Sequence, residues 1–215
     1  MDSKLRSVPT RAIVFDFNGT LSNDEPLLYA VYAELFAKQG RPLTEQEYLD
    51  ELAGQTEDEI IRRWLGRVDD ELIRERIDRY VAYASDGSTI DENARAALRL
   101  AAEHVPVGIV SAAARREIEP VVAAAGVAEH ISALVSADDV TNGKPDPEPY
   151  ERMASLLGLD PGDMIVFEDT EAGVASAKAA GSYVVAVTRT LGRDRLRAAD
   201  DFVPRLDAGV VKQCL

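Results

Sequence analysis

Side chains that bind phosphate or metal ions follow short apolar runs in this sequence, at the points where predicted strands end. The runs cover residues 12–15, 107–110, 133–135 and 164–167. In chain order, the polar residues that come after them are Asp16, Asn18, Ser111, Lys144, Glu168 and Asp169. A lysine, a hydroxyl group and backbone N–H groups can hold phosphoryl oxygens. The set therefore indicates phosphate chemistry in an acidic setting.

The three carboxylates of this set predict a bound Mg²⁺ ion if they converge. Like charges that lie close together raise one another's pKa unless a cation intervenes. Mg²⁺ prefers oxygen ligands, and it is usually held by one or two carboxylates while water and substrate phosphate complete the octahedron. One lysine and one Mg²⁺ would cancel the three negative charges, so a phosphate dianion can enter the site.

The order of apolar runs and helical patterns predicts how these groups are brought together. Short apolar runs bounded by polar residues fit strands that are buried on both faces, and helical patterns separate them after residue 88. This alternation predicts an α/β fold, a doubly wound parallel Rossmann-like sheet with right-handed crossovers. Ligands bind beyond the carboxyl ends of the strands in such sheets, which is where the polar set lies.

A purely helical stretch follows the first run. It contains no comparable apolar run, and Thr44 with Glu47 three residues later is typical of a capping box at a helix start. We therefore predict two units. Residues 1–21 and 88–215 form the Rossmann-like core, and residues 22–87 form an inserted all-helical cap domain.

Composition excludes several classes of partner. The 215 residues include 38 acidic and 24 basic side chains, a formal net charge of −14, which disfavours binding to nucleic acid or to an anionic membrane surface. The single cysteine excludes an internal disulfide. No apolar run reaches membrane-spanning length, and residues 1–10 lack a signal-peptide core. We expect a cytoplasmic monomer or weak homodimer that acts on a small phosphorylated metabolite.

Taken together, the motifs resemble those of the haloacid dehalogenase superfamily, over nearly the whole chain. Each motif alone also fits a plain turn or a helix cap, so the resemblance depends on their common order. They read Asp-Phe-Asn-Gly-Thr-Leu at 16–21, Ile-Val-Ser at 109–111, Gly-Lys-Pro-Asp-Pro at 143–147 and Phe-Glu-Asp-Thr-Glu-Ala-Gly at 167–173. The helical insertion is similar to the small cap of the β-phosphoglucomutase-like and phosphatase branch.

This resemblance implies roles for individual residues. Asp16 would be the nucleophile that takes the phosphoryl group as an aspartyl phosphate, with Lys144 as a further catalytic and phosphate-binding residue. The implied Mg²⁺ ligands are the Asp16 carboxylate, the Asn18 backbone carbonyl, Asp169, and Glu168 either directly or through water. The expected substrate-binding residues are Thr20, Ser111, Ala112 and Lys144, together with Gly54, Gln55 and Thr56 of the cap by analogy.

Asn18 departs from the family pattern, which has an aspartate that protonates the leaving oxygen and later deprotonates water. An amide can do neither, and losing a positioned acid/base typically costs about 10²–10⁴ in rate. Three explanations stay open. Another acid such as Asp24, Glu25 or water serves a substrate with a good leaving group, the protein has drifted toward slow catalysis or phosphoester binding, or the asparagine is engineered or converted by deamidation.

The cap decides among the reactions of the family. The stretch 52–56 lacks the two cations that the β-phosphoglucomutase pattern places around its glycine, and a mutase also needs the acid/base that Asn18 removes. We therefore predict a Mg²⁺-dependent phosphatase-like hydrolase with a phosphoric monoester substrate. The alternatives are a sugar-phosphate mutase and a nearly inactive phosphoester-binding module.

Overall fold

The structure is a computed structural model that describes residues 10–215. The prediction that residues 1–10 lack a signal-peptide core falls almost entirely outside this range. None of the helices described is long and apolar enough to cross a membrane.

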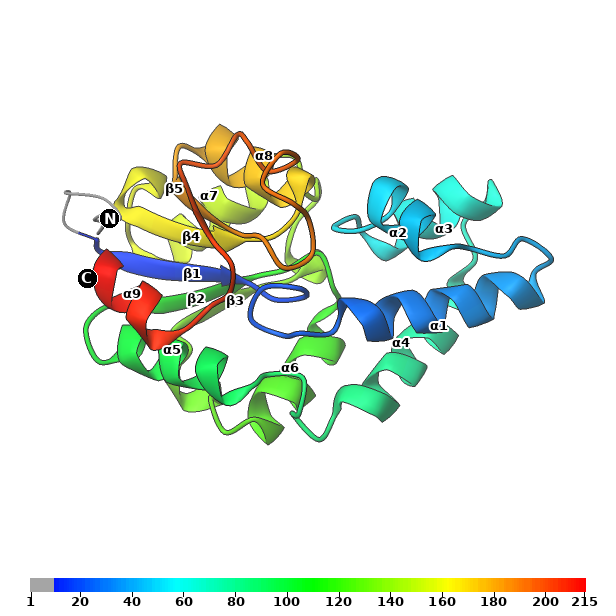
Figure 1. The fold of residues 1–215 in the computed structure, drawn as a ribbon, viewed down its shortest axis with the longest axis horizontal. Helices are drawn as coiled ribbons and strands as arrows, with labels where there is room; N and C mark the ends of the chain where they lie inside the picture. Colours follow the sequence, from blue (N-terminus) through cyan, green and yellow to red (C-terminus); the bar gives the residue numbers. More distant parts are fainter. Residues whose placement is uncertain (1–9) are drawn as a thin grey trace.

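Six parallel strands form one sheet in the described part of the chain, in the order β3-β2-β1-β4-β5-β6 (Figure 1). They are β1 (Ala12–Asp16), β2 (Val107–Val110), β3 (Ala133–Val135), β4 (Met164–Glu168), β5 (Tyr183–Val187) and β6 (Asp201–Val203). Strand order reverses at β1, which has β2 on one side and β4 on the other, so the carboxyl ends of these strands flank the usual ligand crevice. The predicted α/β, doubly wound Rossmann-like fold is confirmed.

Helices and short 3₁₀ turns connect the strands. The α-helices of the described chain are α1 (Glu25–Lys38), α2 (Glu45–Glu51), α3 (Glu57–Leu65), α4 (Asp70–Ala84), α5 (Glu92–Ala102), α6 (Arg115–Ala124), α7 (Glu148–Leu157), α8 (Glu171–Ala180) and α9 (Ala208–Cys214). The 3₁₀ turns are η1 (Ala128–His130), η2 (Ala137–Asp139) and η3 (Pro161–Asp163).

Helices cover both faces of the sheet because successive strand residues point to opposite faces. In β1, Ile13 and Phe15 pack with apolar residues of α5, α6 and α9. Ala12 and Val14 pack instead with residues of α7 and α8. All four side chains are fully buried. Figure 1 shows α7 and α8 above the strands and α5 and α6 below them.

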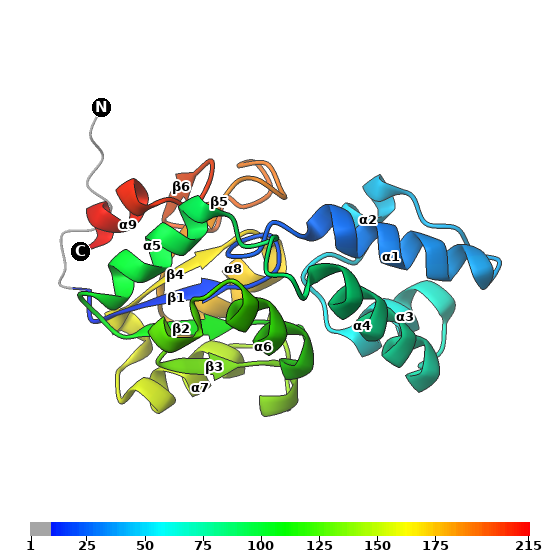
Figure 2. The same cartoon turned by 90° about the horizontal axis from the view of Figure 1, so that it is seen from below.

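The helices α1 to α4, which we call the helical segment, lie together beyond the carboxyl end of β1 (Figures 1 and 2). The predicted capping box begins α2, since the N–H of Thr44 donates to Glu47 Oε2 at 2.8 Å and that of Glu47 donates to Thr44 Oγ1 at 3.3 Å. Aromatic rings fill the interior of the helical segment, where the ring centroids of Phe36 and Trp64 are 6.2 Å apart. The exact division of the chain into two domains stays a prediction.

Two elements lie where none is predicted, after residue 187. The strand β6 has three residues at the edge of the sheet, and Asp201 at its start interrupts any apolar pattern. The helix α9 has seven residues, of which Val211 and Cys214 are buried. An apolar run marks the equally short β3, but Asp201 breaks such a run in β6, and the seven residues of α9 give too few positions for a periodic signal.

Candidate active site

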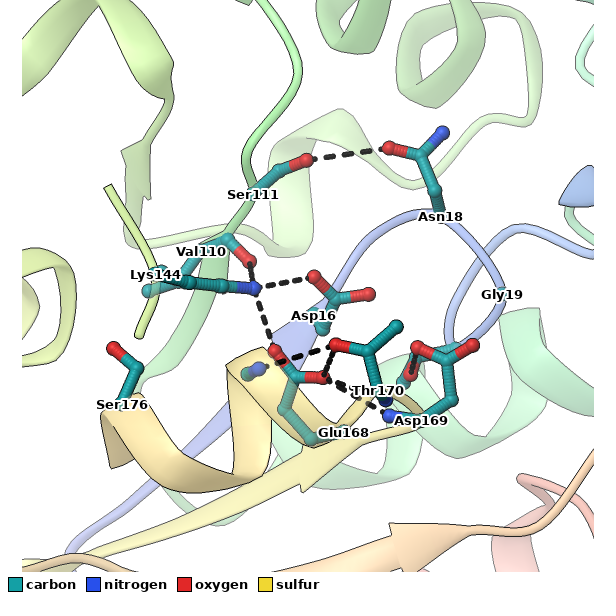
Figure 3. A network of polar contacts seen from close by, with 12 residues as sticks. Asp16, Asn18, Gly19, Val110, Ser111, Lys144, Glu168, Asp169, Thr170 and Ser176 are labelled. Atoms are coloured by element: carbon teal, nitrogen blue, oxygen red, sulfur yellow. Dashed lines mark hydrogen bonds and ion pairs between the residues drawn. The ribbon is translucent and has the colours of Figure 1, made fainter. Parts of the chain in front are cut away.

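Most of the predicted site residues gather at the carboxyl end of the sheet (Figure 3). Asp16 is the last residue of β1 and Glu168 the last of β4, while Ser111 directly follows β2. Lys144 comes from the loop between β3 and α7. These elements are brought together by the parallel pairing of β1 with β2 and with β4.

Lys144 is buried at the centre of the site. Its Nζ donates to Asp16 Oδ1 and to Glu168 Oε1, both at 2.6 Å, and to the backbone carbonyl of Val110 at 3.1 Å. Burial by itself lowers the pKa of this ammonium group, but the charges of Asp16 and Glu168 outweigh burial and hold the pKa above its usual value. Lys144 is therefore a permanent cation that fixes the position of the Asp16 carboxylate.

Asp16, Glu168 and Asp169 form the acidic cluster, in which each residue offers an oxygen within 4.8 Å of the other two. Burial raises the pKa of Asp16 and Asp169 well above the usual aspartate value, and the neighbouring carboxylates raise it further. Lys144 opposes this rise at Asp16. A cation beyond Lys144 would relieve the remaining repulsion.

Asp169 has the oxygen best suited to a metal ion. Its Oδ1 accepts from Thr20 Oγ1 at 3.1 Å, whereas its Oδ2 is buried and has no hydrogen-bond partner among the described residues. The Thr190 hydroxyl lies near enough to lower the pKa of Asp169, but no hydrogen bond of ordinary geometry reaches Oδ2. A buried acceptor without a donor is costly, and a hard cation such as Mg²⁺ would satisfy it.

Glu168 is hydrogen-bonded at both oxygens. Oε1 accepts from Lys144 and, at 2.8 Å, from the Tyr150 hydroxyl. Oε2 accepts from the N–H of Asp169 at 3.0 Å and from Thr170. Glu168 thus fixes Lys144 and the turn that leads into α8, and its place among the metal ligands stays a prediction.

Two glycines make room for these carboxylates. A Cβ atom on Gly19 would lie 1.9 Å from Asp169 Oδ2, and Gly19 also has a φ of +76°. A Cβ atom on Gly173 would lie 1.8 Å from Glu168 Oε1. Both glycines belong to the sequence motifs, but neither is among the predicted site residues. Their positions within the motifs at 16–21 and 167–173 are the sequence signal from which they could have been predicted.

Asn18 is fixed through both ends of its amide. Nδ2 donates to Asp24 Oδ2 at 2.9 Å, and Oδ1 accepts a long 3.4 Å bond from Ser111 Oγ. Asp24 is itself buried and accepts further bonds from Ser22, from the Gly19 N–H and from Tyr80 of α4. An amide at position 18 is therefore compatible with the Asp24 carboxylate, whereas an aspartate at position 18 would place two carboxylates side by side.

A pocket lies between the end of the sheet and the helical segment, and we call it the active-site pocket. The predicted site residues that line it are Asp16, Asn18, Gly54, Gln55, Ser111, Ala112 and Lys144. Thr20 lies behind this wall, fully buried and bonded to Asp169. Thr56 lines a neighbouring groove beside Gly143, and its hydroxyl donates to Glu59 at the start of α3.

The helical segment adds two carboxyl groups, two tyrosine hydroxyls and an arginine to this pocket. They are Glu25, Tyr32, Tyr48, Glu57 and Arg76. Glu25 is named from the sequence as one possible replacement acid, and the other four are not among the predicted site residues. Arg76 stands in a helix rich in charged residues, a pattern typical of a solvated face, yet its side chain is fully buried. It pairs with Glu57 of α3 and with Glu117 of α6, and such tertiary pairing leaves no local sequence signal.

Comparison with known proteins gives the family. The family model for haloacid dehalogenase-like hydrolases matches residues 13–187. A validoxylamine A 7'-phosphate phosphatase from Streptomyces hygroscopicus subsp. limoneus is 31% identical, with 88% of this chain and 91% of the relative covered. A phosphoglycolate phosphatase from Yersinia pseudotuberculosis is 28% identical, with 83% of this chain and 81% of the relative covered.

Solved structures share the fold. CbbY from Rhodobacter sphaeroides, in complex with xylulose-(1,5)bisphosphate, has a TM-score of 0.81 at 23% identity, covering 91% of this chain and 94% of that one. A β-phosphoglucomutase from Clostridium difficile also has a TM-score of 0.81, at 21% identity, covering 91% of each chain. The chain therefore belongs to the haloacid dehalogenase-like hydrolases, and its phosphatase relatives mark it as a phosphoric monoester hydrolase acting on a phosphorylated small molecule.

Proposed function

We propose that this enzyme is a Mg²⁺-dependent phosphatase that moves the phosphoryl group of a small phosphorylated metabolite first to Asp16 and then to water. The observation that carries the proposal is the position of Asp16, which lines the active-site pocket while Lys144 holds one of its oxygens. A carboxylate held in this way can act as a nucleophile and form an aspartyl phosphate.

Residues around Asp16 would receive the phosphoryl group. Ser111 and Ala112 line the pocket at the approach to α6, where backbone N–H groups and a hydroxyl can bind phosphoryl oxygens. Lys144 also lines the pocket and adds a positive charge there. Together they would orient phosphorus toward the Asp16 carboxylate and spread the charge of the transition state.

The proposed Mg²⁺ site comprises the carboxylates of Asp16 and Asp169, the backbone carbonyl of Asn18, and Glu168 directly or through water. The buried Asp169 Oδ2 without a hydrogen-bond partner supports this site. When bound, the ion would neutralise the acidic cluster and help to align the phosphate.

We propose further that residues 22–87 act as a cap domain over a core of residues 1–21 and 88–215. Gly54 and Gln55 line the pocket from the cap side and are the proposed specificity residues. Thr56 would contribute only through the neighbouring groove. A cytoplasmic location and a monomeric or weakly dimeric state complete the proposal.

Asn18 favours a second candidate, a phosphoester-binding module with little turnover, because both ends of its amide are engaged and neither releases a proton. A sugar-phosphate mutase is the third reading. Incubation with Mg²⁺ and a panel of phosphate esters separates the three. Phosphate release without isomers supports the phosphatase, binding without either product supports the module, and isomers that depend on a bisphosphate activator support the mutase.

Metal binding has its own test. Mg²⁺ at about 100 times its dissociation constant should stabilise the chain by about 2.7 kcal/mol, and so raise its melting temperature by roughly 5–11 °C for a domain of this size. Asp169→Asn should abolish most of this shift. A full shift in that variant would contradict the proposed metal site.

A further inference from the structure

The proposed reaction needs a group that gives and takes protons, and Asn18 cannot supply it. Glu25 is the first residue of α1 and lines the active-site pocket together with Asp16 and Asn18 (Figures 1 and 2 show α1 beyond the end of β1). Its Oε2 is buried and has no hydrogen-bond partner among the described residues. We infer that Glu25 carries the protons of both half-reactions, an inference that rests on the proposed phosphatase function.

The neighbouring carboxyl groups are less suited to carry protons in the reaction. Asp24 is held by the Asn18 amide, by the Ser22 hydroxyl at 2.7 Å and by the Tyr80 hydroxyl at 2.5 Å, so its side chain is committed to structure. Glu57 accepts from the Tyr32 hydroxyl at 2.5 Å and pairs with Arg76. Among the carboxyl groups that the helical segment and its entry loop bring to the pocket, Glu25 alone keeps a buried oxygen without a donor in the described residues.

The surroundings of Glu25 allow both protonation states near neutral pH. Burial raises its pKa and the charge of Asp24 raises it further, while the Tyr48 hydroxyl lowers it, which leaves a pKa of about 7. A group with this pKa is suited to acid and base work at physiological pH. Glu25 also lines a second pocket, which we call the side pocket, between α1, α2 and the loop after β5. The titratable and charged groups that line the two pockets with Glu25 are Asp16, Tyr29, Tyr32, Glu45, Tyr48, Glu57, Arg76, Lys144 and Arg189. Asp24 and Asp169 interact with it electrostatically.

The two steps balance with Glu25 as the proton carrier. In the first, an Asp16 oxygen bonds to phosphorus, the bond from phosphorus to the alcohol oxygen breaks, and that oxygen takes the Glu25 proton. In the second, a water oxygen bonds to phosphorus and the bond to Asp16 breaks, while the Glu25 carboxylate takes the water proton. Phosphate leaves, and Asp16 and Glu25 return to their starting states.

The test compares leaving groups. An alkyl alcohol must be protonated as it leaves, whereas para-nitrophenolate leaves without a proton. We expect Glu25→Gln to lower kcat/KM for alkyl phosphates by about 10²–10⁴-fold. For para-nitrophenyl phosphate, kcat/KM should change less than about fivefold, and nitrophenolate should appear in a burst followed by slow hydrolysis of the aspartyl phosphate. The matched control is Glu45→Gln, which changes an exposed acid of the side pocket.

Rescue separates a proton role from a structural role. In the double variant Asn18→Asp/Glu25→Gln, the new aspartate should restore alkyl phosphate turnover at least tenfold over Glu25→Gln alone. An equal loss for alkyl and aryl substrates, an unchanged alkyl rate, or a failure of rescue in a double variant that melts like the wild type would overturn the inference. If wild-type enzyme releases no phosphate, or Asp16→Asn retains turnover, the proposed function fails and the inference fails with it.

Discussion

The buried ion pair between Arg76 and Glu117 allows a quantitative prediction. Arg76 lies on α4 of the helical segment and Glu117 lies on α6, which covers the sheet. Arg76 Nη1 and Nη2 donate to the two oxygens of Glu117 at 2.5 and 2.9 Å, and both side chains are fully buried. We predict that Glu117→Gln will strongly destabilise the chain, because it leaves the Arg76 charge buried with only Glu57 as a partner.

Removing one partner of a buried pair costs about 3–5 kcal/mol. For a domain of this size, that loss corresponds to a drop in melting temperature of roughly 6–20 °C. Glutamine keeps an acceptor for the Ala114 N–H, which now donates to Glu117 Oε2 at 3.1 Å, so the change isolates the charge. Replacing both partners, as Arg76→Met with Glu117→Leu, should recover only part of the lost stability. Apolar groups of similar volume avoid the desolvation cost, but Glu57 then loses its cation.

The assay is urea unfolding at pH 7, followed by circular dichroism and by the fluorescence of Trp64, the single tryptophan. Arg116 and Asp78 provide the control, because they join the same two helices with the charges exchanged, at 3.4 Å and in an exposed position. Exposed pairs contribute about 1 kcal/mol or less, so Asp78→Asn should leave the midpoint nearly unchanged. If Glu117→Gln lowers the free energy of unfolding as little as Asp78→Asn does, the reasoning is refuted.

Three further predictions concern the site. Asn18→Asp should raise the turnover of alkyl phosphates with little change in Mg²⁺ affinity by calorimetry, and equal or lower turnover would count against an acid/base role for this position. Gly173→Ala should lower the free energy of unfolding by about 1–3 kcal/mol and reduce turnover, because its Cβ would displace Glu168; denaturant unfolding and a phosphate assay check both. The folded-state pKa of Glu25 is about 7 against 4.5 for an ordinary glutamate, so the stability that its protonated form contributes is complete below about pH 4.5 and is lost as pH rises through 7. Between pH 5 and pH 8, the free energy of unfolding of metal-free Glu25→Gln should therefore rise relative to that of the wild type, by at most about 3 kcal/mol. If the two free energies change with pH in parallel, this pKa shift is excluded.

The sequence predicts the core of the site because each motif is attached to a strand end. The runs before Asp16 and Glu168 are continuously apolar since β1 and β4 are buried on both faces, and parallel pairing then brings their ends together. Lys144 could be placed only through its motif, because the loop that carries it has no periodicity of its own.

The cap side of the pocket could be predicted only in part, through Gly54 and Gln55 by analogy and Glu25 as one of several possible acids. Glu25 and Glu57 stand in the first turns of helices, where acidic residues are common for reasons of the helix dipole alone. Arg76 is surrounded in sequence by charged residues, and its burial is made tolerable by Glu57 and Glu117, which lie 19 and 41 residues away. Roles of this kind depend on the packing of one helix against another.

The Arg76–Glu117 pair also restricts how the pocket can open. A motion that carried α4 away from α6 without admitting water to both groups would leave one charge buried without its partner. At about 1.4 kcal/mol for each tenfold change in population, a cost of 3–5 kcal/mol would leave such an open form at roughly one molecule in 10² to 10⁴. Arg76 ties α3 to α4 in the same way through Glu57, so we expect substrate to enter by movement of α2 while α3 and α4 stay in place. Amide hydrogen exchange should then be slower in α4 than in α2, and the reverse order would contradict this route of entry.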